Sequence, residues 1–277
     1  MFEFKTWKNG NRRAPHKPLL LLLAIGAWQS GRELNWLIIQ EELSQLLKQF
    51  GKLGPLRPQY PFIRLQNDGL WVVDGFEDFQ GDAKVTELTQ INPGARLAPE
   101  VIDALEAHPD QLGTIVNELL YNHFPGSMHD AIITATGIRL DSTGQSQLTT
   151  QRTRDPNFRI DVLTAYNYQC AVCGYGARMN DGVVGLEAAH IQMHARNGPD
   201  TVSNGLALCS LHHTLFDYGA FTVTPLFNIE ISNRINGPGA QNELFEYNSK
   251  PISRVRNEAM LPASSYLNWH RAEIFKG

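Results

Sequence analysis

Two interlocked sets of side chains that bind metals or move protons lie between residues 170 and 217. One set is Cys170-x-x-Cys173 followed by Cys209-x-x-His212. Two short chelating loops of this kind offer the four sulfur and nitrogen ligands that zinc takes in a tetrahedral structural site. The spacing therefore predicts a structural zinc. The alternatives are a buried Cys209 beside an incidental cysteine pair, and a redox-active pair, although the βαβ setting of a redox pair is missing.

The second set consists of His190, Asn204, His213 and Asp217, and these residue types suit phosphodiester hydrolysis. The reaction needs an activated water and a cation near the leaving oxygen. His190 is the candidate general base, because the usual pKa of histidine lies near neutral pH. His213 is the candidate ligand of the catalytic metal, and Asp217, four residues further on the same helix face, is a second. Asn204 is expected to bond backbone across the loop and hold His190 in place.

The order of elements around these residues resembles the HNH, or ββα-metal, endonucleases. The pattern predicts a strand over 186–191, a loop over 198–204, a strand over 206–208 and a helix from 212. The spacing of 14 residues from His190 to Asn204 and nine from Asn204 to His213 is similar to that family, as are Ala-Ala-His-Ile and His-x-Leu-Phe-Asp. The resemblance covers residues 155–277 and implies a DNA nuclease with one divalent cation, such as Mg²⁺ or Mn²⁺.

The chain departs from one common form of the HNH pattern at residue 189. That form has a metal-binding Asp or His directly before the general base, whereas this chain has Ala189. Glu187 is the nearest carboxylate and His194 is a further option, so the strand-side ligand of the catalytic metal stays open. A solvent-facing carboxylate and an ordinary loop histidine are the competing interpretations of these two residues.

Apolar periodicity upstream predicts a separate, mixed helical domain. Two helices followed by a hairpin around Asn67-Asp68-Gly69 favour a winged-helix-like layout. A stretch rich in Ser, Thr, Gln and Gly over 141–153 predicts a linker between domains 1–140 and 154–277, which gives an α+β chain. The expected helices cover 18–29, 39–50, 101–105 and 111–124, the expected strands 62–65 and 70–73, and a further helix begins near 155.

Cations gather ahead of the first helix, in Arg12-Arg13-Ala14-Pro15-His16-Lys17-Pro18. Free amides at a helix start and nearby positive charge suit phosphate, and a solvated basic loop is the alternative. Together with Tyr60-Pro61-Phe62-Ile63-Arg64-Leu65 and Asp68-Gly69-Leu70-Trp71, this segment resembles the sulfur-binding domain of phosphorothioate-dependent restriction endonucleases over residues 1–77.

The second resemblance implies binding of double-stranded DNA in which a backbone oxygen is replaced by sulfur. Tyr60 and Pro61 would form an apolar notch for the sulfur, which is larger and more weakly hydrated than oxygen. Arg13 would bind the modified phosphate. A turn before a strand is the alternative for Tyr60-Pro61, and a structural hydrogen bond is the alternative for His16. The other expected phosphate or base contacts are Arg12, His16, Lys17 and Arg64.

Length and composition limit the remaining possibilities. With 277 residues, 42% of them hydrophobic, the chain can form two cores. Three cysteines, all in the zinc-type set, favour a reducing, cytoplasmic location. The apolar run 18–28 is too short to span a bilayer, and its flanking prolines favour a helix start over a signal peptide. Because the net charge is -4, contact with DNA would have to come from local patches of positive charge.

The combined expectation is a metal-dependent DNA endonuclease of a restriction system, with an N-terminal reader and a C-terminal HNH domain. One HNH site cuts one strand, so cleavage of both strands predicts a homodimer or two successive events. One rival is an HNH endonuclease that reads methylated or unmodified sequence. The other is a non-catalytic DNA-binding protein with a degenerate nuclease fold, which Ala189 favours.

Overall fold

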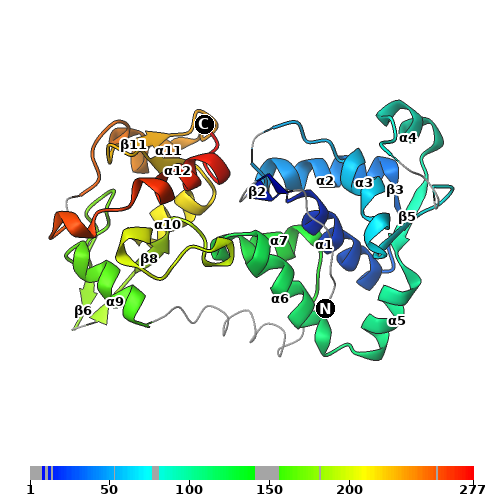
Figure 1. Ribbon diagram of the computed structural model, residues 1–277, viewed down its shortest axis with the longest axis horizontal. Helices are drawn as coiled ribbons and strands as arrows, with labels where there is room; N and C mark the ends of the chain where they lie inside the picture. The colour runs from blue at the N-terminus through cyan, green and yellow to red at the C-terminus, as the bar shows by residue number, and fades with distance from the viewer. Residues whose placement is uncertain are drawn as a thin grey trace. The chain divides into compact units, whose positions relative to one another are not determined.

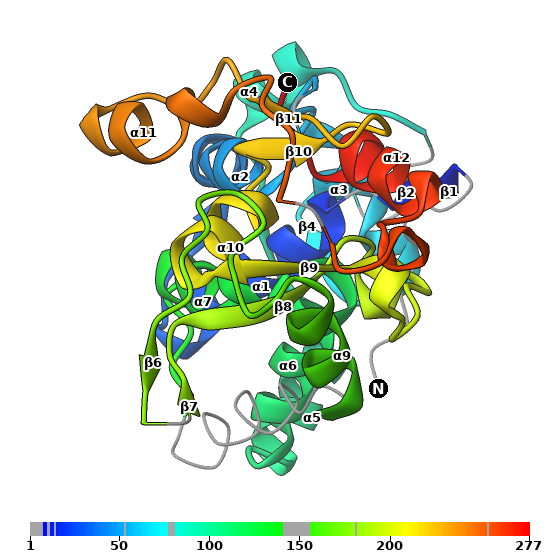
Figure 2. The ribbon, with the colours of Figure 1, turned by 90° about the vertical axis from the view of Figure 1, so that its left-hand side faces the viewer.

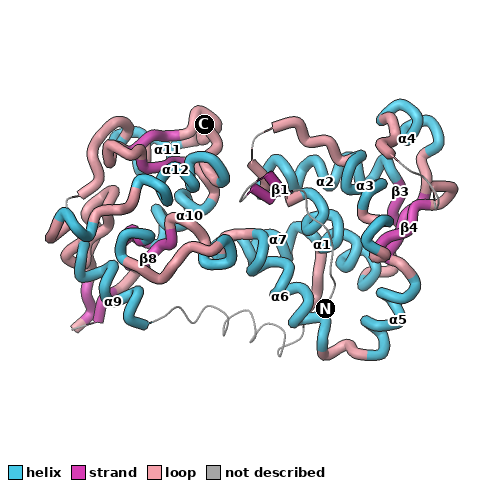
Figure 3. The backbone as a smooth tube through the Cα atoms, viewed as in Figure 1, coloured by secondary structure: helices cyan, strands magenta, loops and turns pink. Residues whose placement is uncertain are grey.

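The computed structural model describes residues 8–9, 12–13, 15–52, 54–76, 81–140, 156–180, 182–253 and 255–277. The chain divides into two compact units, Met1–Arg152 and Thr153–Gly277 (Figure 1). The linker expected over 141–153 lies outside the described residues. Helices and short antiparallel sheets occur together, which confirms the α+β class (Figure 3). Among the described helices, none has the length and apolar character needed to cross a membrane.

Helix α1 (His16–Gln29) forms the centre of the N-terminal unit (Figure 1). Its residues from Pro18 to Ala27 are all buried, because other elements contact several of its sides. At Gly26 a Cβ would lie 1.9 Å from the carbonyl oxygen of Thr136, the last residue of helix α7 (His129–Thr136), so this helix can approach only a glycine. The contacting elements are α2 (Trp36–Phe50), α3 (Gln59–Arg64), α6 (Gln111–His123), α7 (His129–Thr136) and β5 (Gly94–Leu97).

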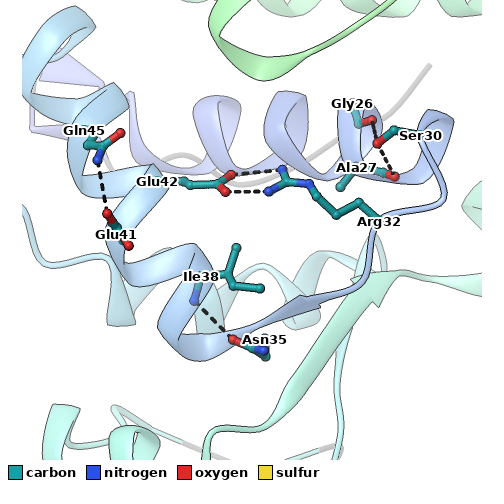
Figure 4. A network of polar contacts seen from close by, with 9 residues as sticks. All are labelled: Gly26, Ala27, Ser30, Arg32, Asn35, Ile38, Glu41, Glu42 and Gln45. Atoms are coloured by element: carbon teal, nitrogen blue, oxygen red, sulfur yellow. Dashed lines mark hydrogen bonds and ion pairs between the residues drawn. The ribbon is translucent and has the colours of Figure 1, made fainter.

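Polar side chains define the junction between α1 and α2 (Figure 4). Ser30 donates its hydroxyl to two carbonyls in the last turn of α1. Asn35 begins α2 as its N-cap, because its side-chain oxygen accepts the Ile38 N–H at 3.1 Å. Arg32, between the helices, forms a two-point ion pair with Glu42. The end of one helix and the start of the next are therefore both satisfied by local hydrogen bonds.

A three-stranded antiparallel sheet in the order β3 (Leu34–Asn35), β5, β4 (Trp71–Val73) packs in the same unit. The strand predicted over 62–65 is wrong, because these residues lie in α3 and at its C-cap. Pro58 and Pro61 occupy the start of that helix, where a missing N–H costs little. Since β4 pairs with β5 and not with a preceding strand, the hairpin of the winged-helix-like layout is also corrected.

The other predicted helices of the N-terminal unit are confirmed as α2, α5 and α6. Helix α5 covers Pro99–Ala107. Three short elements of this unit were not predicted from the sequence: β1 (Lys8–Asn9), β2 (Arg12–Arg13) and α4 (Val85–Ile91).

The C-terminal unit is built around the antiparallel pair β8 (Leu186–His190) and β9 (Gly205–Cys209) (Figure 2). Helices α9 (Pro156–Ala165) and α10 (Ser210–Asp217) both contact this pair. The predicted order of strand, loop, strand and helix is therefore confirmed. Side chains alternate along β8, so residues 187 and 189 share one face, and residues 186, 188 and 190 share the other.

Two further hairpins and two helices surround this centre. In α12 (Ser264–Glu273) the buried His270 stacks on Phe216, with ring centroids 3.6 Å apart. Its Nε2 donates to the Phe216 carbonyl at 3.1 Å, and burial lowers the pKa of His270 to about 3. His270 is therefore a neutral core residue. The bounds are β6 (Arg178–Met179), β7 (Gly182–Val183), β10 (Phe221–Val223), β11 (Ile229–Ile231), α11 (Pro238–Glu243) and α12 (Ser264–Glu273).

Candidate functional site

The four zinc-type side chains come together at the start of α10. The ligand atoms of Cys170, Cys173, Cys209 and His212 all lie within 4.8 Å of one another. Sγ of Cys173 lies 4.0 Å from Sγ of Cys209, and Sγ of Cys170 lies 3.8 Å from Nδ1 of His212. Ligand sulfurs about 2.3 Å from one tetrahedral zinc lie about 3.8 Å apart. The donor set and its spacing therefore fit zinc.

His212 presents Nδ1 to the cysteines because its other ring nitrogen is engaged. Nε2 donates to the carbonyl oxygen of Glu243 at 3.0 Å, which leaves the lone pair on Nδ1. That nitrogen lies 3.1 Å from Sγ of Cys209. A hydrogen bond from the Cys209 thiol lowers the pKa of Cys170. This favours the thiolate, which is the form of cysteine that binds metals.

His213, the next residue of α10, contacts two carboxylates through different ring nitrogens. Nδ1 lies 2.6 Å from Oε2 of Glu187, and Nε2 lies 3.6 Å from Oδ2 of Asp217. The other oxygen of Glu187 accepts the Ser210 hydroxyl at 3.0 Å, so this strand residue faces α10. The structure thus brings together the three residues expected near the catalytic metal, with the buried His213 between the two acids.

His190, at the end of β8, has a different set of partners. Its Nε2 lies 2.6 Å from Oδ1 of Asp200, in the loop between β8 and β9. The ring stacks on Phe158 of α9, with centroids 4.1 Å apart and planes at 19°. His194, the other histidine considered as a metal ligand, lies with its ring centroid 6.4 Å from that of His190. It belongs to the surroundings of the candidate base.

Asn204 bonds backbone across the same loop. Its Oδ1 accepts the Gln192 N–H at 2.8 Å, and its Nδ2 donates to the carbonyls of Gln192 at 2.9 Å and Pro199 at 3.0 Å. The side chain is completely buried. Gly198 closes the loop, because a Cβ at that position would lie 1.9 Å from the Gln192 carbonyl oxygen. The path of the chain after His190 is therefore fixed by one amide side chain and one glycine.

In the N-terminal unit, Tyr60 and Pro61 lie in the first turn of α3. Pro61 is buried and Tyr60 is partly exposed. Two guanidinium groups flank the tyrosine ring, with Cζ of Arg64 4.5 Å and Cζ of Arg57 5.6 Å from its centroid. Arg64 is held by Asp82 in a two-point ion pair at 2.6 and 2.8 Å. Two cations therefore lie beside the Tyr60 ring at this end of α3.

His16 and Lys17, at the start of α1, both have partners within the unit. Nε2 of His16 donates to the carbonyl of Leu56 at 2.7 Å, which ties the start of α1 to the loop before α3. Burial lowers the pKa of His16, so its ring is neutral at pH 7. Lys17 forms an ion pair with Asp68, whose side chain is 3% exposed. The side chains of Arg12 and Arg13 lie outside the described residues.

Two residues beside these groups were assigned no role from the sequence, although Asp200 ends the Gly-Pro-Asp stretch that resembles the HNH family. Arg57 has φ of 43°, in the left-handed region that residues other than glycine rarely adopt. In the sequence, the position of Arg57 three residues before Tyr60 was the feature that could have indicated a contact with that ring. Asp200 lies four residues before Asn204, and its contact with His190 depends on a loop path that spacing alone does not reveal.

Family models match a part of each unit. Residues 1–141 match a family model described as "ScoMcrA-like, DNA sulfur-binding domain", and residues 170–224 match one described as "HNH endonuclease". No match was found among the curated proteins.

Similar solved structures include the "Sulfur binding domain of ScoMcrA complexed with phosphorothioated DNA", at 20% identity and a TM-score of 0.43, covering 49% of this chain and 90% of that one. The corresponding domain of SprMcrA, also complexed with phosphorothioated DNA, shows 26% identity and a TM-score of 0.41, covering 48% and 87%. The "Modification dependent TagI restriction endonuclease" shows 22% identity and a TM-score of 0.33, covering 50% and 41%.

Proposed function

Because the chain belongs to the ScoMcrA-like DNA sulfur-binding domain family, we propose that it is a modification-dependent endonuclease that recognises phosphorothioated duplex DNA. One observation carries the proposal: a sulfur-binding domain over 1–141 and an HNH endonuclease domain over 170–224 occur in one chain. The first domain selects the DNA and the second cuts it nearby. We assign the activity to restriction in the cytoplasm, where the three free thiols stay reduced.

Recognition is assigned to the adjoining starts of α1 and α3. Tyr60 and Pro61 offer the apolar surface that a weakly hydrated sulfur prefers to water. The bond from His16 to the loop before α3 supports this assignment, because it joins the basic segment to the Tyr60 region. Arg13 is proposed to bind the modified phosphate. The further proposed contacts to phosphates or bases are Arg12, His16, Lys17 and Arg64.

Cutting is assigned to His190 and a divalent cation. His190 takes a proton from the attacking water, and Asn204 holds the loop that follows it. Two donors bound to one Mg²⁺ at about 2.1 Å lie about 3–4 Å apart, which suits Nε2 of His213 and Oδ2 of Asp217 at 3.6 Å. When bound, the cation stabilises the charge that develops on the phosphate oxygens.

Glu187 is assigned to the orientation of His213 and not to the metal itself. Its 2.6 Å contact with Nδ1 has the length of a hydrogen bond and is too short for two donors around one cation. Carboxylates commonly orient metal-binding histidines in this way. Zinc in the Cys170, Cys173, Cys209 and His212 cluster is proposed to hold the start of α10 and thereby support both ligands of the catalytic ion.

The proposed function is tested by cleavage and binding assays on matched duplexes with and without one phosphorothioate, in Mg²⁺, Mn²⁺ and other divalent ions. We expect preferential cutting of the modified duplex. His190→Ala should abolish cutting and leave binding intact. Tyr60→Ala should reduce the roughly 10- to 100-fold preference for sulfur, because a single-atom contact is worth about 1–3 kcal/mol. Gln45→Ala, on an exposed part of α2, is the matched control and should retain the preference.

Each contrary outcome points to a different rival. Equal cutting of both duplexes would reject sulfur recognition and favour a reader of methylated or unmodified sequence. Binding without cutting in every ion would favour a non-catalytic protein, for which Ala189 is the supporting residue.

A further inference from the structure

The ring of His190 is held from two directions. Phe158 stacks on one face, and Oδ1 of Asp200 lies 2.6 Å from Nε2. The His190 side chain is 13% exposed and that of Asp200, an exposed loop residue, is 29% exposed, so the contact is open to water on the Asp200 side. A short bond between imidazole and carboxylate fixes the orientation of the ring and places a proton on Nε2.

The placement of Asp200 depends on the same clamp that closes the loop. Asn204 donates to the carbonyl of Pro199, the residue directly before Asp200, at 3.0 Å. Gly198, on the other side of Pro199, lies against the Gln192 backbone without room for a side chain. Since His190 lies only two residues before Gln192, the two ends of the loop are joined beside the candidate base. Asn204 therefore positions the Asp200 carboxylate beside His190 through the loop backbone.

We propose that Asp200 is a positioning residue for the general base, an inference that rests on the proposed nuclease function. Its carboxylate holds the imidazole in one orientation through Nε2. It also stabilises the imidazolium that forms when Nδ1 takes a proton from the attacking water, because the contact at Nε2 then becomes an ion pair between opposite charges. In this arrangement the asparagine of the HNH set acts on the base through Asp200.

The groups around His190 make the charge of Asp200 testable. His194 of the following 3-10 turn is the other titratable ring near His190, at 6.4 Å between centroids. Arg159 of α9 donates to the carbonyl of Leu186, four residues earlier in β8. Replacing Asp200 by asparagine keeps the size and an acceptor oxygen for Nε2 but removes the negative charge. The variant therefore separates a charge effect from simple loop closure.

The experiment compares full-length wild type with Asp200→Asn, using Asp161→Asn, an exposed carboxylate on α9, as the matched control. Two quantities are measured: the single-turnover cleavage rate of a phosphorothioated duplex across pH, and the titration midpoint of His190 by NMR, assigned with a His190→Gln spectrum. We expect Asp200→Asn to lower the plateau rate about 10- to 100-fold. The NMR midpoint and the ascending limb should both move about one unit to lower pH, because a neighbouring anion is lost.

Two results would overturn the inference. An unchanged midpoint would show that Asp200 does not act on His190 through its charge, even if the rate falls. An unchanged plateau rate would show that the contact does not serve the reaction. If wild type cuts no duplex in any ion, the proposed function fails, while the NMR midpoint still decides whether Asp200 holds His190. The control should match wild type in both measurements.

Discussion

His212 and His213 are adjacent in the sequence, yet their side chains serve different groups. Successive residues of a helix are rotated by about 100°, so neighbours on α10 face different surroundings. Nδ1 of His212 approaches the cysteines, whereas His213 lies between Glu187 and Asp217. The two histidines are therefore expected to cause different losses when each is removed.

Alanine substitution of each histidine tests this separation. We expect His212→Ala to lower the zinc content and the melting temperature, because one of four metal ligands is lost. We expect His213→Ala to keep the zinc but reduce cleavage more than about 100-fold, since even residues behind a metal ligand cost 10- to 100-fold. Zinc content by elemental analysis, thermal unfolding and cleavage rate are the measurements. Equal zinc loss in both variants would contradict two separate groups.

At the residue scale, the sequence predicted those metal-binding sites in which the residue types and their spacing vary little from protein to protein. Two chelating pairs predicted the Cys170 to His212 cluster, because zinc chemistry restricts both residue types and loop lengths. The contact from Asp200 to His190 was not predictable, since it depends on how Asn204 folds the intervening loop. The partner of Glu187 was also open, because alternation fixes its face but not what lies opposite.

At the scale of elements, long apolar patterns were predictable and short ones were not. Helix α1 was indicated by its run of leucines. The short strands β8 and β9 were indicated by their place beside His190 and Asn204 in the HNH-like motif and not by a period of their own. Residues 62–65 are too few to show a period, so the same apolar residues suit a strand or a helix. The start of α3 at Gln59 depends on Pro58, Pro61 and burial against α1, and burial is a tertiary effect.

The packing of α12 against β10 predicts a pH dependence of stability. His270 is neutral in the folded chain because burial lowers its pKa to about 3, whereas an unfolded histidine titrates near 6.5. The contribution of the neutral His270 to the free energy of unfolding is complete above pH 6.5. It is lost as the pH falls from 6.5 toward 3, because only the unfolded chain then takes up the proton. The free energy of unfolding should drop by up to about 1.4 kcal/mol per pH unit from this group.

Urea unfolding of wild type and His270→Gln at pH 7.5, 6.5 and 5.5 measures this effect. The comparison at equal pH removes contributions that both proteins share, including those of the zinc-type cluster. Wild type should lose more stability than the variant between pH 6.5 and 5.5. Parallel curves for the two proteins would show that His270 does not account for the dependence.

At the scale of the whole molecule, a chain with a net charge of -4 must bind a polyanion through local groups. Phosphate contacts position DNA, and a few cations suffice when they are gathered on one surface. Within the described residues of the N-terminal unit, the arginines beside Tyr60 are candidates for such a surface. Cutting belongs to the other compact unit, so selection and hydrolysis are carried by separate cores.

One nuclease unit per chain makes a prediction about stoichiometry. A single HNH site cuts one strand, so a double-strand break requires two sites or two events. We expect the DNA-bound protein to have about twice the chain mass of 31.0 kDa, measured by sedimentation. A plasmid with one modified site should then give linear product with little nicked intermediate. A lone monomer at micromolar concentration, with nicked plasmid accumulating first, would favour successive single cuts.

The adjacency of His212 and His213 also bears on how this segment can change over evolutionary time. A one-residue insertion in the first turn of α10 would rotate the following side chains by about 100° and carry His213 away from Glu187. A deletion would misplace His212 relative to Cys209 in the same way. Substitutions can be compensated individually, but a change of length displaces both groups at once. When related chains are aligned, insertions and deletions are therefore expected in the loops before and after residues 209–217, and not between residues 209 and 217.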